Sequence, residues 1–468
     1  MARLLDPATF GLVAMALVTL KTFSYLSQIG LSMTMGTMQR VTIDSQDLRV
    51  TLGIVWVSSL VAITAVVFLA PLASAFFHRP ELTALVQALA VSLLLQALAN
   101  VSVSLLRRQL RFKAMAIVET IGYALGFGVV GIACAVSGWG PWSLVAATIG
   151  QWLVTFALAY ALTRHALLPR WKRAEASHWR YGARHTAISF SEFLSANVST
   201  LLIGRLLGDA ALGLYNRAQV LAYQPVEKAA GIITKVLFPV VAALQHDIAK
   251  VGQLYILGFG FIGVWASAVS LSLYAAAPEV VALLLGPQWG DAVPVVRLLT
   301  LAVPAIFMSN ISGVVCDAMN LLEFKLKLQM AGMALVLALV ILLSPFGITG
   351  IVAGLVIGEW IRALVYFYYL ADRLDYQHLD CLRSVAAVTG TGLIAWSAVH
   401  FSLGAVQDKH LGLGWLLLIA ISMGAIGLGT GLLLLWRLLD STQIGRLGRT
   451  QVPGWQQLCR ITGRTEGA

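Results

Sequence analysis

Long apolar runs, each close to the length of a membrane-spanning helix, occupy most of the sequence. Crossing the hydrocarbon core of a bilayer, about 30 Å thick, takes roughly 20 residues of α-helix. Backbone amides find no water in that core, so only helices and closed barrels can cross it. The runs here are continuous rather than alternating, which is the pattern of helices and not of barrel strands. The sequence therefore predicts an all-α polytopic membrane protein.

We predict thirteen spans from these runs. Short breaks separate them, such as "HRPEL", "SGWGP", "GPQWGD" and "SPFGITG", and no break is long enough to hold a soluble domain. Any function must then reside within the helical bundle. The predicted spans are 9–38, 51–77, 82–106, 113–137, 142–163, 184–207, 209–245, 253–277, 291–322, 328–345, 349–371, 384–403 and 412–436.

The distribution of charge indicates a membrane topology rather than a nucleic-acid partner. Only 11% of the residues are charged and the mean hydropathy is +0.84, whereas a soluble domain has about 25% charged residues. The formal net charge is +11, and 22 of the 32 Lys and Arg fall in one set of alternate loops plus the C-terminal tail. The opposite set of loops holds four. This bias predicts that the first set and the tail are cytoplasmic, and we expect no nucleic acid to bind.

One phrase occurs twice, at the start and in the middle of the chain. The stretches "MARLLDPATFGLVAMA" (1–16) and "IGRLLGDAALGLYNRAQ" (203–219) place Arg3 and Arg205, and Gly11 and Gly213, 202 positions apart. Six predicted spans lie within that separation, and an even number returns the second copy to the same orientation. We therefore expect two parallel repeats, related by an axis along the membrane normal, around a central cavity with sites near mid-membrane.

Each copy also reads as a turn that leads into a new helix. Gly208 suits a helix end, and Asp6 and Asp209 suit the N-cap of the next helix. Gly11 and Gly213 then permit close helix approach. A span precedes the second copy, whereas two residues precede Arg3. We expect that the first helix is missing from the chain as written, with 13 spans where 14 (six, six and two) would form the full set.

This reading divides the chain into five parts. They are an N-terminal lobe with five of its six helices (1–163), a basic cytoplasmic linker (164–183), a C-terminal lobe of six helices (184–371), two extra helices (384–436) and a basic cytoplasmic tail (437–468).

Two segments carry a family resemblance: "IGRLLGDAALGLYNRAQVLAYQPVEKAAGIITKVLFPVVAALQHD" and "LRRQLRFKAMAIVETIGYALGFGVVGIACAVSGWGPWSLVA". They resemble the polysaccharide transporters, or Wzx-like flippases, of the multidrug/oligosaccharidyl-lipid/polysaccharide (MOP) exporter superfamily. The likeness runs from residue 1 to about residue 371 and is weaker beyond. It implies two six-helix lobes that open alternately, and export of capsule, exopolysaccharide or O-antigen units on undecaprenyl diphosphate. The family pattern often has an acid where Ser199 stands, and Glu192, seven residues earlier, is the candidate replacement.

A stripe of cations is the main candidate site. A charge at a helix centre costs about 2.5–3.5 kcal/mol on insertion scales, so such residues usually face a cavity or a partner. Arg217, Lys228 and Lys235 are separated by 11 and 7 residues, which at 100° per residue are nearly whole turns. Gln224 shares this face. The stripe suits a diphosphate or an acidic sugar. Alternatively, Arg217 and Lys235 extend to the two interfaces.

Other charges within the spans are secondary candidates. Lys21 lies in the corresponding helix of the first half and is expected to line the same cavity. Glu119, Glu192 and Asp317 are lone carboxylates that pair with the cations or accept a coupling proton. Glu359 and Arg362 are three residues apart, which favours an ion pair within one helix.

A basic cluster between two spans could attract anionic lipid head groups and gather an anionic substrate. Its members are Arg107, Arg108, Arg111 and Lys113. The four cysteines are scattered without metal-ligand spacing, and the enzyme motifs His-Glu-x-x-His, P-loop and nucleophile elbow are not present in the sequence. We therefore expect no catalytic residue, no metal and no cofactor.

The sequence thus predicts a bacterial inner-membrane flippase that moves a lipid-linked oligosaccharide by alternating access. Its expected partners are that substrate, membrane lipids and, as an open possibility, the polysaccharide polymerase and export machinery. Three alternatives remain. A cation-coupled drug exporter of the same superfamily would favour an acidic cavity, a polyprenyl-linked sugar polymerase or ligase would need a large outer loop, and a scaffold subunit would not need charges within its spans.

Overall fold

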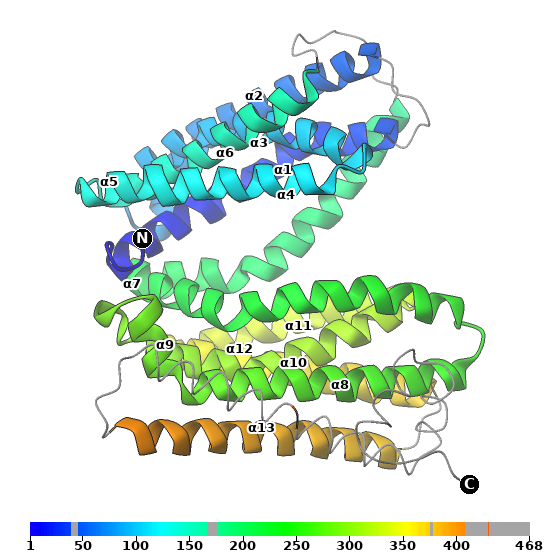
Figure 1. Cartoon of the computed structure of the whole chain (residues 1–468). Helices are drawn as coiled ribbons and strands as arrows, with labels where there is room; N and C mark the ends of the chain where they lie inside the picture. The colour runs from blue at the N-terminus through cyan, green and yellow to red at the C-terminus, as the bar shows by residue number, and fades with distance from the viewer. Residues whose placement is uncertain (39–44, 166–175, 375–377, 408–428, 430–468) are drawn as a thin grey trace. The chain divides into compact units, whose positions relative to one another are not determined.

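The computed structural model describes residues 1–38, 45–165, 176–374, 378–407 and 429. Within these residues the secondary structure is helical and contains no strand (Figure 1), which confirms the predicted all-α class. The predicted span 412–436 and the tail 437–468 lie outside the described residues, apart from residue 429.

The helices follow one another with short connections. They are α1 (Pro7–Met38), α2 (Ser45–Phe77), α3 (Leu82–Arg108), α4 (Phe112–Tyr123), the π-helix η1 (Ala124–Gly131), α5 (Ile132–Val136), α6 (Pro141–Thr163), α7 (Ala176–Ala243), α8 (Ile248–Ala275), α9 (Ala277–Leu284), the 3₁₀ turn η2 (Pro287–Trp289), α10 (Ala292–Ala318), α11 (Leu322–Leu343), the 3₁₀ turn η3 (Ser344–Phe346), α12 (Gly347–Arg373) and α13 (His378–Gln407).

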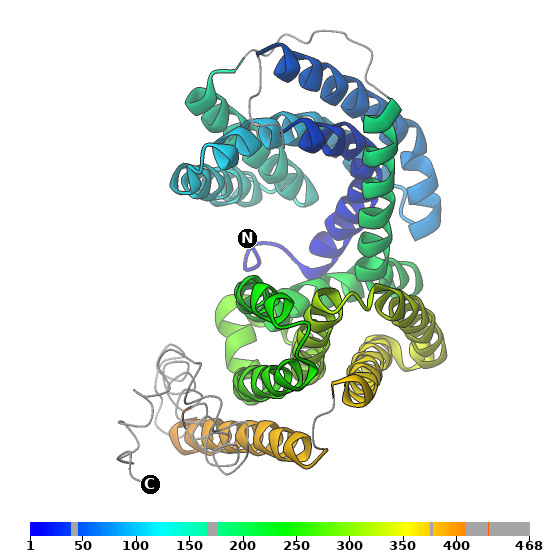
Figure 2. The same ribbon diagram turned by 90° about the vertical axis from the view of Figure 1, so that its right-hand side faces the viewer.

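The chain forms two compact units, residues 1–216 and 217–468. In unit 1, α3 packs against α2 and α6, and α1 packs against α2 and α3. In unit 2, α8 packs against α10 and α13, and α12 packs against α10 and α11. Figure 2 shows the ribbon turned by 90°, with α13 in orange. The core of unit 2 lies between α8, α10 and α12, where Tyr255 donates to or accepts from Ser312 at 2.9 Å.

Ten helical stretches of the described residues are long and apolar enough to cross a membrane. Each of the twelve predicted spans up to residue 403 overlaps one of these stretches, and the stretches Asn197–Gln224 and Leu322–Arg373 each overlap two of them. The protein is therefore a multi-span membrane protein, while the total number of crossings stays a prediction.

The two units share one local plan. Helices α3 and α10 each have 27 residues, and their first residues are 210 positions apart. The turns that follow them have matching backbone hydrogen bonds: Arg111 N donates to Leu106 O at 3.0 Å, and Leu321 N donates to Cys316 O at 2.8 Å. Leu110 and Asn320 occupy the same left-handed position, with φ of 56° and 58°. An internal repeat is thus visible within the two units separately.

Several predicted spans differ from the observed helices; those predicted from 184 and 328, for example, begin earlier in the structure, at Ala176 and Leu322. The span predicted at 291–322 runs past the end of α10 at Ala318, because Met319 and Leu321 continue the apolar pattern while Asn320 turns the backbone. The span predicted at 113–137 contains the π-helix η1 rather than a plain α-helix. There Gly126 packs so closely on α6 that an added Cβ would lie 2.6 Å from the Gln151 Cα.

Candidate functional site

The two copies of the repeated phrase contact each other within unit 1. A Cβ added to Gly11 would lie 1.7 Å from the carbonyl oxygen of Asp209, and one added to Gly213 would lie 1.8 Å from that of Pro7. Pro7 and Asp209 are themselves 202 positions apart, so the contact is reciprocal. Backbones approach this closely only where no side chain intervenes. The predicted close approach is confirmed, and the partner of each copy is the other copy.

The helix α7 is interrupted at Gly208, which has φ 83° and ψ −170°. Residues of the α2–α3 turn contact both sides of this break. Arg79 Nη2 lies 2.6 Å from Asp209 Oδ1, after the break. Arg205, before the break, donates to the Phe76 carbonyl at 2.6 Å, contacts the His78 ring, and places its guanidinium 5.5 Å from the Phe76 ring centroid. We refer to Arg79, Arg205, Asp209 and His78 as the Gly208 clamp.

The two predicted N-caps differ in their contacts. The Asp6 carboxylate accepts a hydrogen bond from Thr9 N at 3.1 Å, which is N-cap geometry at the start of α1. The Asp209 carboxylate instead accepts from the adjacent Ala210 N at 3.0 Å and pairs with Arg79. The sequence contained no signal for this pair, because its partners are 130 residues apart.

The predicted cationic stripe lies on α7. The backbone is helical from Asp209 to Ala243, so Arg217, Gln224, Lys228 and Lys235 keep the spacing of one helix face. The Arg217 side chain is half-buried and that of Gln224 is exposed. The side chains of Lys228 and Lys235 lie outside the described part of the structure. Lys21, the candidate from the first half, is exposed on α1.

The acidic candidates have different surroundings. Asp317 forms an ion pair with Lys325 at 2.7 Å across the α10–α11 turn, a partner that the sequence did not indicate. Glu119 is exposed on α4, and the Glu192 side chain lies outside the described residues. Glu359 and Arg362 form the predicted ion pair within α12.

The basic cluster Arg107, Arg108, Arg111 and Lys113 is gathered at the α3–α4 turn of unit 1. Arg107, Arg111 and Lys113 are exposed, and Arg108 is half-buried. The cluster therefore presents a concentrated positive surface beside the end of a membrane span.

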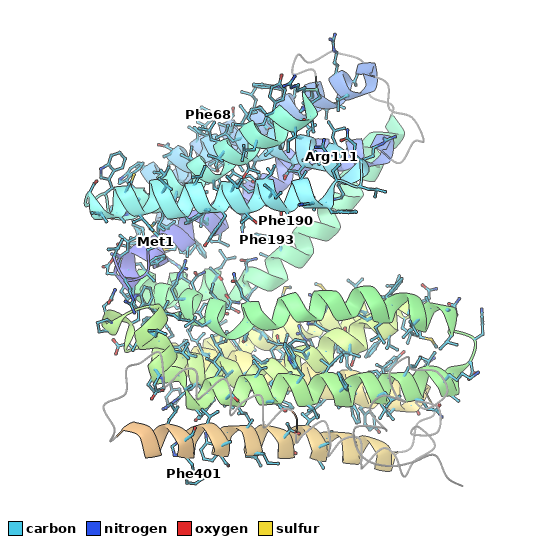
Figure 3. All side chains as sticks on the ribbon, in the orientation of Figure 1. Met1, Phe68, Arg111, Phe190, Phe193 and Phe401 are labelled. Atoms are coloured by element: carbon cyan, nitrogen blue, oxygen red, sulfur yellow. The ribbon has the colours of Figure 1, made fainter. Side chains whose placement is uncertain are left out.

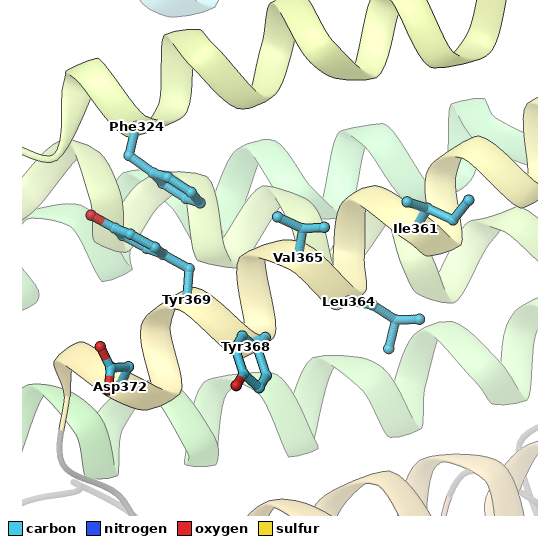
Figure 4. A pocket seen from close by; sticks show the side chains of 7 residues that line it. All are labelled: Phe324, Ile361, Leu364, Val365, Tyr368, Tyr369 and Asp372. Atoms are coloured by element: carbon cyan, nitrogen blue, oxygen red, sulfur yellow. The ribbon is translucent and has the colours of Figure 1, made fainter. Parts of the chain in front are cut away.

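Unit 2 contains an apolar pocket of about 590 Å³ between α11 and α12 (Figure 4). Phe324 and Tyr369 stack in it, with ring centroids 3.5 Å apart. The pocket contains none of the predicted site residues. Its lining residues are Phe324, Ile361, Leu364, Val365, Tyr368, Tyr369 and Asp372.

Among the described residues, no group of three or more His, Cys, Asp or Glu side chains is placed to hold a metal ion. Within the described structure, the candidates for contact with a ligand include Arg217 of α7, the basic α3–α4 turn and the apolar pocket.

Comparisons with known proteins place the chain among polysaccharide biosynthesis proteins. A family model described as "Polysaccharide biosynthesis protein" matches residues 1–294. The chain is 28% identical over 309 residues to the lipopolysaccharide biosynthesis protein WzxC of Escherichia coli (strain K12). It is 28% identical over 311 residues to the succinoglycan biosynthesis transport protein ExoT of Rhizobium meliloti (strain 1021). Each alignment covers 64% of this chain and 61% of the relative, so the chain spans about three fifths of these relatives' length.

The fold is similar to that of two solved transporters. The lipid II flippase MurJ, in an inward closed conformation, aligns with a TM-score of 0.67 and 13% identity over 92% of both chains. An inward-facing multidrug resistance MATE family transporter of the MOP superfamily aligns with a TM-score of 0.61 and 17% identity, over 79% of this chain and 91% of that one. At these identities the likeness establishes the fold, which agrees with the resemblance seen in the sequence.

Proposed function

The chain belongs to the polysaccharide biosynthesis protein family, and from that membership we propose that it moves a lipid-linked oligosaccharide across a bacterial inner membrane. The family match over residues 1–294 carries the proposal, because it contains all the cationic positions of α7. Relatives named for lipopolysaccharide biosynthesis and succinoglycan transport support it. The substrate of this proposal is an undecaprenyl-diphosphate-linked oligosaccharide for exopolysaccharide, capsule or O-antigen.

In the proposed mechanism, two lobes open alternately to each side of the membrane. The lobes are 1–163 and 184–371, joined by the linker 164–183 and followed by the helices of 384–436. The common plan of α3–α4 and α10–α11 supports two repeats. The reciprocal contact of Gly11 and Gly213 supports a two-fold relation between α1 and the second segment of α7. The two compact units divide later, at 216/217, because the first segment of α7 and the first residues after Gly208 belong to unit 1.

The cations of α7 hold the anionic part of the substrate in this proposal. Their side chains supply hydrogen-bond donors that suit a diphosphate. The donors are Arg217, Lys228 and Lys235, together with Gln224 on the same helix face and Lys21 on α1. Arginine adds a planar fork that binds two phosphate oxygens at once. Glu119 and Glu192 are the acids that pair with these cations or accept a coupling proton. Asp317 is already engaged by Lys325, so we assign it to that pair.

The proposal also assigns the basic segments of the chain to one side of the membrane. The basic linker 164–183, the α3–α4 turn and the tail 437–468 face the cytoplasm. Arg107, Arg108, Arg111 and Lys113 gather anionic lipids, the substrate among them, on the entry side. Export would then deliver the substrate to a polysaccharide polymerase.

Replacing Arg217 or Lys228 by alanine tests the site. Hydrogen bonds to charged groups contribute roughly 1.5–3 kcal/mol, so each variant is expected to lower polymer export about tenfold or more at an unchanged membrane level. Export is measured as surface polymer in a strain that depends on this gene, and protein level by immunoblot of isolated membranes.

Lys250→Ala is the matched control, because Lys250 pairs with Asp247 at the start of α8 and is not on the stripe. It should export normally. Full export by the Arg217→Ala/Lys228→Ala double variant would refute the assignment of the site. If that double variant exports polymer normally but loses resistance to cationic drugs, the result would favour the drug exporter instead.

A further inference from the structure

The α3–α4 turn of unit 1 carries a charge that its counterpart in unit 2 lacks. With the separation of 210 positions, Arg107 corresponds to Asp317 and Lys113 corresponds to Glu323. In unit 2 these acids pair with Lys325 and Lys327, both at 2.7 Å, so the turn is electrically balanced. In unit 1 the same backbone turn holds four cations. The shape of the turn therefore does not require its positive charge.

Three of these cations, Arg107, Arg111 and Lys113, are not neutralised by the described residues of unit 1. Within the described part of the chain, no carboxylate forms an ion pair with Arg107, Arg111 or Lys113, and all three are exposed. Lys113 lies in the first turn of α4, where the partial positive charge of the helix end disfavours a cation. The equivalent turn of α11 has Glu323, which that helix end favours. An anion from outside the protein would remove this electrostatic disadvantage.

Two apolar side chains project from the same turn. Leu110 is 73% exposed and has φ 56°, a left-handed conformation that leucine disfavours. Its counterpart Asn320 has φ 58°, and asparagine tolerates this conformation. Phe112 is 54% exposed. Leu110 lies between two membrane spans and Phe112 is the first residue of the second. A strained, exposed leucine beside an exposed phenylalanine indicates an apolar contact outside the protein.

We infer that residues 107–113 form a docking surface for an anionic phospholipid of the adjoining leaflet. Arg107, Arg111 and Lys113 bind its phosphate through charge-assisted hydrogen bonds. Leu110 and Phe112 insert between the acyl chains at the interface, as apolar side chains flanked by cations do in membrane-surface segments. Arg111, the residue before the first residue of α4, is labelled in Figure 3. The inference rests on the proposed recruitment of anionic lipids at this turn and narrows it to a resident phospholipid that is not transported.

The charge part of the inference is tested on the purified full-length chain in detergent. Native mass spectrometry gives the affinity of the first phosphatidylglycerol bound and, separately, of phosphatidylcholine. Each Lys or Arg near an anionic lipid raises the binding affinity roughly fivefold. The variant Arg107→Gln/Arg111→Gln loses two such residues and should therefore bind phosphatidylglycerol about 30-fold more weakly. The control Lys250→Gln/Lys327→Gln removes two cations that already have partners and should bind as wild type does.

The apolar part is tested with Leu110→Asn, which copies the residue of the unit 2 turn. It should bind phosphatidylglycerol about tenfold more weakly, yet melt at the same or a higher temperature in lipid-free detergent because the backbone strain is relieved. A purely structural role for Leu110 would leave lipid affinity unchanged.

Three results would overturn the inference. They are wild-type affinity in the Arg107→Gln/Arg111→Gln variant, equal affinity for phosphatidylcholine, and displacement of the first bound phosphatidylglycerol by undecaprenyl diphosphate but not by a second anionic phospholipid, phosphatidylserine. The last result would assign the surface to the substrate head group and would leave the proposed transport standing.

Discussion

Gly11 and Gly213 are the residues whose identity the packing restricts most directly. Helices in a bilayer gain little from apolar burial against one another, since the lipid tails are equally apolar, and they associate through close packing of small residues. Here each glycine faces a backbone carbonyl of the opposite helix. A methyl group at either position would force the helices apart, and because the contact is reciprocal, both positions should respond alike.

Gly11→Ala is expected to lower stability by about 1–3 kcal/mol, the usual cost of overpacking. Thermal unfolding of the purified protein in detergent measures this loss. Gly258→Ala is the matched control: among the described residues no atom lies within 4 Å of an added Cβ there, and alanine favours a helix by up to about 1 kcal/mol. Equal melting temperatures for the two variants would contradict the observed crossing.

Gly208 divides α7 into two helical segments that differ in their packing and in the side chains that they carry. The segment before Gly208 packs in unit 1, and the segment after it carries Arg217 and the stripe. The Gly208 clamp ties both ends of the break to the α2–α3 turn, so the direction in which the second segment leaves depends on contacts far away in the sequence. An aspartate also caps the start of α8. The Asp247 carboxylate pairs with the Lys250 ammonium and accepts a hydrogen bond from Lys250 N at 3.2 Å. Both contacts stabilise the carboxylate and lower the pKa of Asp247.

The Arg79–Asp209 pair should show energetic coupling. The side chains are 46% and 17% exposed, and exposed pairs contribute up to about 1 kcal/mol. A double-mutant cycle of Arg79→Ala and Asp209→Ala, followed by thermal unfolding, should give a coupling of about that size. The swapped variant Arg79→Asp/Asp209→Arg should recover part of it. Strictly additive losses would show that the pair does not hold the break.

Across the full chain, the arrangement of spans predicts which turns face which side. Gln109 precedes α4 and Trp139 follows α5, so they lie at opposite ends of this span, and both are exposed. In a cysteine-free background, Gln109→Cys should react with an impermeant maleimide only from the cytoplasmic side, and Trp139→Cys only from the outside. Labelling of intact cells and of inverted vesicles measures this, and the reverse pattern would contradict the charge-based topology. The background replaces Cys134, Cys316, Cys381 and Cys459.

Several features of this protein follow from its sequence alone. The all-α class and the approximate spans depend on apolar runs, because a bilayer imposes the same length and the same hydrogen-bond requirement on every crossing. The Asp6 cap and the Glu359–Arg362 pair join residues three apart. Such contacts are set by helix geometry, whatever lies around them. The repeat was visible because two segments of one chain preserve the same residues at one spacing.

The tertiary structure decided which residues are partners. The repeat showed that Gly11 and Gly213 are equivalent, but only packing showed that they contact each other. The pairs Arg79–Asp209 and Asp317–Lys325 depend on how turns and helices meet, and no periodic signal encodes such meetings. The basic cluster was visible in the sequence. Its contrast with the balanced turn of unit 2 became visible only because the two turns share a backbone hydrogen bond and a left-handed residue, which shows that their positions are equivalent.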